Sequence, residues 1–132
     1  MLFPSDLEQN AFRSRNGEFG WTRAQIPLIV STLRSKKLAI LGGELWWVRD
    51  GREDYSGLIP QRHGAPAVYS WETKRELNES WAHFVERGAS ESIAAVGRWP
   101  DPMELPADMT GHILYNLTWV SDAEFESLRC RV

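Results

Sequence analysis

The sequence predicts an α+β protein, with a mostly antiparallel sheet of about four to five strands and helices packed on it. Three observations predict this class. The length of 132 residues and the hydrophobic content of 42% are typical of one globular domain, covering residues 1–132. Helix-start signals lie toward both ends of the chain, and strand-like alternation lies between them. The expected element order is α-α-β-β-(β)-β-α-β-α.

Helix starts are marked by the capping box, in which Ser or Thr is followed three residues later by Glu or Gln. The pairs are Ser5/Glu8, Thr22/Gln25, Thr73/Glu76 and Ser121/Glu124. Two of them also carry a hydrophobic staple across the helix start, which pairs Trp21 with Ile26 and Val120 with Phe125.

The first helix is expected from about Ser5 to Arg15, before Asn16-Gly17. The second follows Thr22, and Pro27 requires it either to kink or to begin near Ile26. Its core-facing stripe consists of Ile26, Ile29, Val30 and Leu33.

The third helix is expected from Thr73 or Asn78 to Arg87, with Gly88 as its stop. Its predicted buried face consists of Leu77, Trp81, Phe84 and Val85. A short helical continuation over Ser90 to Val96 follows. The last helix is short and turns Phe125 and Leu128 inward.

The strands lie mainly between the second and third helices. Leu38 to Leu41, Gly42-Gly43 and Glu44 to Val48 predict a tight hairpin. Asp50-Gly51 marks a turn. Further strands are expected near Tyr55 to Ile59, over Ala67 to Glu72 and over Gly111 to Val120, with a loop at residues 60–66.

Alternation along the strands predicts which side chains face the core. On the last strand the core face consists of Ile113, Tyr115, Leu117 and Trp119, and the mixed face of Leu114, Asn116, Thr118 and Val120. Trp46 and Trp47 are neighbours, so they point to opposite faces of the sheet. One of them therefore lies under a helix layer, under a loop or at a binding surface.

Several function classes are disfavoured by what the sequence lacks. It has no phosphate-binding loop, nucleophile elbow or His-Glu-x-x-His motif, so we predict no catalytic residue, metal site or cofactor. The net charge of −3 and the scattered basic residues argue against nucleic acid. The apolar runs are too short for a bilayer. The absence of a signal-peptide pattern and the single cysteine, Cys130, predict a cytoplasmic protein.

The polar residues of the sheet allow one chemical alternative. Glu44 and Glu72 would suit acid–base chemistry if both faced one cavity, but exposure on a strand is the simpler interpretation. His83 is expected on the solvent side of the third helix.

The seven tryptophans are the best functional lead, because tryptophan is enriched at binding hot spots. The candidate binding residues combine sheet aromatics with nearby charged residues: Trp46, Trp47, Asp50, Arg52, Tyr55, Arg62, His63 and Trp71. The alternative is that most of the aromatic residues form the core.

The chain resembles small bacterial immunity-type α+β proteins. The matching segments are Leu41-Gly42-Gly43-Glu44-Leu45-Trp46, Tyr69-x-Trp71, Glu79-x-Trp81 and Tyr115-Asn116-Leu117-Thr118-Trp119-Val120. The resemblance implies a cytosolic, catalytically inert protein that binds a cognate toxin domain. It carries over no functional residue.

Three hypotheses follow. The first is a non-enzymatic partner of another protein, of the immunity or antitoxin type, with an exposed aromatic patch near Trp46 or Trp47. The second is a small-molecule binder or enzyme with an aromatic-lined pocket on the sheet. The third is a homodimer that uses the second face of the last strand.

Overall fold

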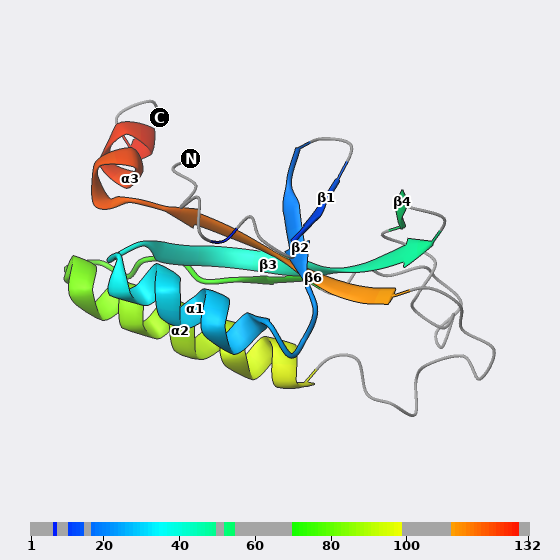
Figure 1. The fold of residues 1–132 in the computed structure, drawn as a ribbon. Coiled ribbons are helices and arrows are strands. Elements are labelled where there is room, and N and C mark those ends of the chain that lie inside the picture. Colours follow the sequence, from blue (N-terminus) through cyan, green and yellow to red (C-terminus); the bar gives the residue numbers. More distant parts are fainter. Residues whose placement is uncertain are drawn as a thin grey trace, which may run out of the picture.

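A computed structural model describes residue 7 and residues 11–14, 17–49, 52–54, 70–98 and 112–129 (Figure 1). The elements in order are β1 (Phe12–Arg13), β2 (Phe19–Trp21), α1 (Ile26–Ser35), β3 (Ala39–Arg49), β4 (Arg52–Asp54), β5 (Ser70–Glu72), α2 (Trp81–Arg98), β6 (His112–Val120) and α3 (Asp122–Arg129). The strands form one antiparallel sheet in the order β1-β2-β6-β3-β4, with β5 also paired to β3. The α+β class is confirmed.

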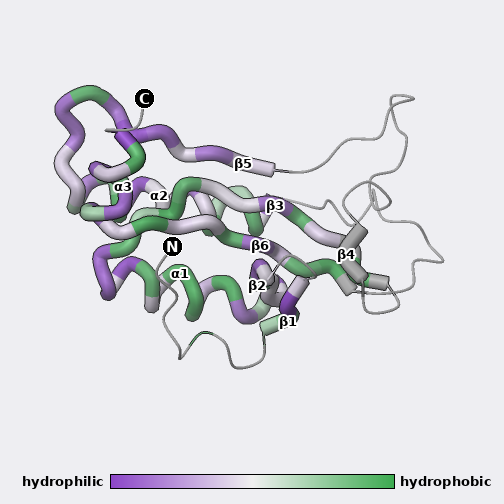
Figure 2. Tube along the Cα trace, turned by 90° about the horizontal axis from the view of Figure 1, so that it is seen from above, coloured by the Kyte–Doolittle hydropathy of each residue, from purple (hydrophilic) through white to green (hydrophobic). Residues whose placement is uncertain are grey.

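The main core lies between the sheet and a layer formed by α1 and α2, below the sheet in Figure 1. The predicted stripe of α1 is fully buried, and hydrophobic and hydrophilic residues alternate along this helix in Figure 2. From the sheet, Leu45, Tyr115, Leu117 and Trp119 are at most 3% exposed. The predicted core face of β6 is therefore confirmed for Tyr115, Leu117 and Trp119, and Ile113 packs against the same cluster.

The start of α1 settles the question raised by Pro27. The helix begins at Ile26, so Pro27 lies in its first turn, where a missing backbone N–H removes no helical hydrogen bond. One bond of the expected capping box forms, from the backbone N of Thr22 to Oε1 of Gln25 at 2.9 Å.

The first expected helix is wrong at its C-terminal end. Phe12 and Arg13 form β1, which pairs with β2. The backbone N of Ser14 then donates to the carbonyl of Glu18, which closes the connection between the two strands. Pairing with β2 gives the backbone N–H and C=O groups of this segment hydrogen-bond partners, and the weak helical pattern of the segment does not outweigh this pairing.

The hairpin predicted at Gly42-Gly43 is also wrong. β3 continues through both glycines, with β6 on one side and β5 on the other. A side-chain Cβ at Gly42 would lie 2.2 Å from the carbonyl oxygen of Trp71, and one at Gly43 would lie 2.1 Å from that of Asn116. The glycines are needed because neighbouring backbones approach closely, not because the chain turns.

Gly88 does not end a helix, because α2 is one continuous helix from Trp81 to Arg98. A Cβ at this position would lie 2.6 Å from the carbonyl oxygen of Ile40, so the glycine allows α2 to approach β3 closely. Ser80 caps the helix start, accepting a hydrogen bond from the backbone N of His83 at 3.1 Å. Leu77 therefore precedes the helix, and its predicted burial is wrong, since it is 92% exposed.

The last two elements are predicted more closely. β6 begins at His112 and ends at Val120. The capping box of α3 is complete, with bonds of 3.0 and 3.1 Å between Ser121 and Glu124. Phe125 faces inward as expected and packs on α2, but Leu128 is 48% exposed, which corrects its predicted inward orientation.

The remaining predicted strands are tested only in part. β5 confirms the end of the strand expected over Ala67 to Glu72, while residues 67–69 lie outside the described residues. The strand expected at Tyr55 to Ile59 and the loop at residues 60–66 also lie outside them. β4 is a strand just before the first of these segments.

Candidate functional site

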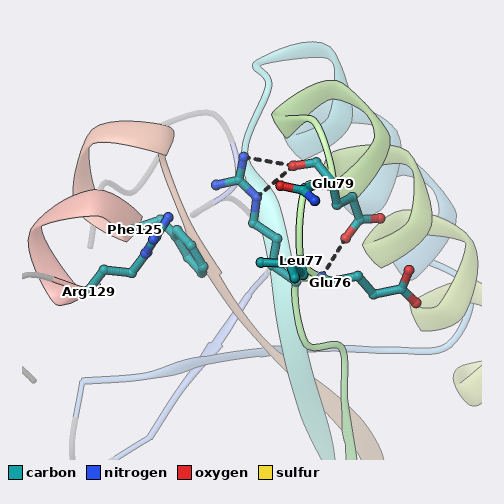
Figure 3. A pocket seen from close by; sticks show the side chains of 7 residues that line it. Glu76, Leu77, Glu79, Phe125 and Arg129 are labelled. Carbon is teal, nitrogen blue, oxygen red and sulfur yellow. Dashed lines mark hydrogen bonds between the residues drawn. The ribbon is translucent and has the colours of Figure 1, made fainter.

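A hollow among the described residues lies where the turn before α2 meets α3 (Figure 3). Its volume is about 420 Å³. It is lined by Arg75, Glu76, Leu77, Asn78 and Glu79 from the turn and by Phe125 and Arg129 from α3. We call this hollow the α3 pocket.

The turn that forms one wall is held by local hydrogen bonds. The backbone N of Glu76 donates to Oε1 of Glu79 at 3.0 Å. Asn78 has a φ of 65°, a left-handed conformation that asparagine adopts more readily than most residues. These features place Leu77 at the tip of the turn, almost fully exposed at the rim of the pocket.

Glu79 fixes the turn to α2. Arg87 donates from Nε to Oε2 at 2.8 Å and from Nη2 to Oε1 at 2.9 Å, which makes a two-point ion pair. Arg87 also donates to the carbonyl of Lys74. The carboxylate of Glu79 contacts Nδ1 of His83 as well, while the His83 side chain stays 64% exposed, as predicted.

This arrangement shifts the acidity of the carboxyl group. The Arg87 hydrogen bonds hold the pKa of Glu79 well below its usual range, against the opposing effect of desolvation, and the backbone N–H of Glu76 and the His83 ring act in the same direction as Arg87. The turn is therefore held by an ionised carboxylate over the whole neutral range.

Arg75 lines the pocket and contacts the turn, α2 and α3. Its Nε and Nη2 donate to the carbonyl of Glu79 at 3.1 and 3.0 Å (Figure 3). Its guanidinium lies over the rings of Trp81 and Phe125, at 5.3 and 5.2 Å from their centroids. Such contacts between a cation and aromatic faces are favourable, so Arg75 helps to hold α3 against α2.

The third nitrogen of Arg75 is different. Nη1 is buried and has no hydrogen-bond acceptor among the described residues. It forms an ion pair with Glu126, whose Oε1 lies 3.7 Å away and also 3.5 Å from Nη1 of Arg129. At 3.7 Å the contact with Arg75 is an ion pair rather than a hydrogen bond.

A second hollow lies on the sheet and includes two predicted residues. Glu44 and Trp71 line it together with Glu18, Asn116 and Thr118, among others, and its volume is about 330 Å³. Glu72, the other carboxylate considered from the sequence, does not line it. Glu44 accepts a hydrogen bond from Nε1 of Trp46 at 2.8 Å.

The structure does not gather the predicted binding residues at one described site. Trp46 is completely buried against Phe12, with ring centroids 6.4 Å apart, which does not support a role in direct binding. Trp71 is half-buried and donates to Oγ of Ser92 at 3.1 Å. Trp47 and Arg52 belong to β3 and β4, and the set's other members, Asp50, Tyr55, Arg62 and His63, lie outside the described residues.

Sequence reasoning missed the α3 pocket because it placed Leu77 inside the third helix. A usable signal was present in Asn78, which favours a left-handed turn, followed by the helix-capping Ser80. No comparable signal identifies Arg75, because its neighbours in space come from α2 and α3.

Comparison with protein-family models, curated proteins and solved structures finds no match. Within the described part of the chain, no group of three or more His, Cys, Asp or Glu side chains is arranged to hold a metal ion. None of the helices described there has the length and apolar character needed to cross a membrane.

Proposed function

We propose that this protein acts by binding another protein, in the manner of cytoplasmic immunity or antitoxin proteins, and that the α3 pocket and its rim form the contact surface. Binding rather than catalysis is part of this proposal. The observation that carries it is the position of Leu77, a leucine that is 92% exposed at the edge of a hollow.

A single exposed leucine is common on protein surfaces. Leu77 differs from Leu28, which is also exposed at 70%, because it adjoins the α3 pocket. The turn that carries Leu77 is held by the Glu79 contacts. An apolar side chain on a preorganised turn loses little conformational entropy when a partner covers it. This supports Leu77 as an anchor for a partner protein.

The test compares two leucines of similar exposure. Tagged wild-type protein, Leu77→Asp and Leu28→Asp are used to capture proteins from the cells that naturally produce the chain. We expect one partner to be retained by the wild type and by Leu28→Asp and lost by Leu77→Asp, with equal thermal unfolding temperatures for both variants. Equal capture by all three proteins would refute the proposal.

Self-association is a separate outcome of the same variants. Sedimentation of the purified protein at several concentrations shows whether the partner is a second copy of the chain. If the wild type forms a dimer that Leu77→Asp abolishes, the surface is a homodimer contact, and the immunity-type proposal is wrong.

The second candidate function is the binding of a small ligand on the sheet. It is favoured by the hollow that Glu18 and Glu44 share, because two carboxylates there would attract a cationic ligand. Titration with spermidine, monitored by the amide resonances of β3, tests it. Saturable shifts that Glu44→Gln weakens would support the candidate, and their absence would exclude a polyamine ligand.

A further inference from the structure

We propose that a carboxylate side chain that projects from the surface of a folded partner binds between Arg75 and Arg129 at the edge of the α3 pocket, and that Glu126 occupies this position in the free protein. The inference rests on the proposed function and specifies the chemistry of the partner. In the complex, the incoming carboxylate bonds to Nη1 of Arg75 and pairs with Arg129, while Leu77 enters an apolar depression beside that acid.

The need for an acceptor follows from the bonding of Arg75. Two of its nitrogens are committed to the carbonyl of Glu79, and its guanidinium also lies over the neighbouring rings of Trp81 and Phe125. Only Nη1 has no acceptor among the described residues, and it is buried. A buried donor without an acceptor is unfavourable, so an oxygen ligand placed there restores a lost hydrogen bond.

A carboxylate matches this position better than a neutral oxygen. Arg129 brings a second guanidinium to the same place, and its Nη1 and that of Arg75 converge on one carboxylate oxygen of Glu126. The protein thus already shows which group fits between the two arginines. A bond from an arginine to a carboxylate is also stronger than one to a neutral acceptor.

Glu126 is a replaceable occupant. Its side chain is 53% exposed, and its contacts of 3.7 and 3.5 Å are long. Exposed ion pairs of this kind contribute little, so the side chain can move into solvent at small cost. A partner acid that approaches Nη1 at hydrogen-bonding distance would displace it and uncover Nη1.

The shape of the pocket rim indicates what kind of molecule carries the carboxylate. Leu77 projects beside the pocket, so a complementary surface must combine a depression for the leucine with a protruding acid (Figure 3). A folded protein surface can hold both features at a fixed spacing, whereas a flexible chain end supplies the acid without the depression. We therefore assign the carboxylate to an Asp or Glu side chain.

The experiment uses the isolated full-length chain and a small probe. N-acetylglutamic acid α-amide, which carries only the side-chain carboxylate, is titrated while the indole N–H resonance of Trp81 is followed by NMR. This indole lies next to Arg75 and donates to the carbonyl of Lys37 at 2.8 Å. The uncharged N-acetylglutamine α-amide is the matched probe.

We expect weak saturable binding of the acid and none of the amide. Glu126→Gln should bind the acid about threefold more tightly, because the internal competitor has lost its charge. Glu86→Gln, an equal change at an exposed position on α2 that is paired with Arg34, should bind like the wild type. Arg75→Gln should abolish binding, provided that its amide spectrum remains that of a folded chain.

Unchanged affinity in Glu126→Gln, equal shifts with the acid and the amide, or absence of saturation would each overturn the inference. These outcomes differ from failure of the proposed function. If Leu77→Asp loses the partner but the acid does not bind, the proposed protein contact stands. Only the inference that the partner supplies a carboxylate is then rejected.

Discussion

The helices on the two sides of the sheet are attached in different ways. α1 buries Ile26, Ile29, Val30 and Leu33, and α2 buries seven residues, whereas α3 buries none. α3 lies above the end of the sheet in Figure 1, and its main apolar attachment is Phe125. That ring packs 5.8 Å from Trp81 and 5.7 Å from Phe84, between centroids.

A complete local helix signal does not imply deep burial. Both bonds of the capping box form at α3, which buries no residue. A cap decides where a helix begins, because it satisfies backbone donors of the first turn. Packing against the sheet decides how firmly the helix is held, so α3 should be the easiest helix to separate from the fold.

The largest expected effect is on the free energy of unfolding, when leucine is replaced by alanine in α1 and, for comparison, in α3. Leu33 is completely buried, and Leu33→Ala should lower the free energy of unfolding by about 2–5 kcal/mol. Leu128→Ala removes the same atoms from a side chain that is 48% exposed and should cost less than about 0.5 kcal/mol. Urea unfolding of both variants measures the difference, and equal losses would show that α3 is as much a part of the core as α1.

A smaller effect is expected from glycines within α2. Gly88→Ala places a Cβ 2.6 Å from the carbonyl of Ile40 and should destabilise by about 1–3 kcal/mol. Gly97→Ala meets nothing within 4 Å and should stabilise by at most about 1 kcal/mol, through helix propensity. Thermal unfolding of the two variants checks this, and destabilisation by both would mean that propensity is not the governing factor at Gly97.

The smallest effect concerns the turn that supports the α3 pocket. Because the pKa of Glu79 is lowered in the folded protein, the unfolded chain binds the proton more readily. The stabilisation is therefore complete above the unfolded pKa of about 4.3 and is lost as the pH falls toward the folded pKa.

We expect Glu79→Gln to lose less stability than the wild type between about pH 5 and pH 3 in urea unfolding. Glu86→Gln serves as the control with the same chemical change at an exposed site on α2. Parallel losses in the wild type and Glu79→Gln would show that the carboxylate of Glu79 does not stabilise the turn.

The candidate site was much less predictable than the fold class. The sequence pointed to aromatic residues of the sheet, but Trp46 is buried against Phe12 of β1, and the mostly polar α3 pocket was not foreseen. Arg75, Trp81 and Phe125 are separated along the chain and meet only because α3 returns to the start of α2. Composition and spacing carry no signal for such a meeting.

The sequence by itself determined the features that depend on neighbouring residues. The capping box at Ser121, the apolar stripe from Ile26 to Leu33 and the alternation of the last strand each arise from local hydrogen bonding or a fixed period. Only the tertiary structure decided the meaning of the glycines. Gly42, Gly43 and Gly88 look like turns or helix ends in the sequence, yet each lies within a strand or helix. Glycine is needed at these positions because a neighbouring backbone approaches too closely for any side chain.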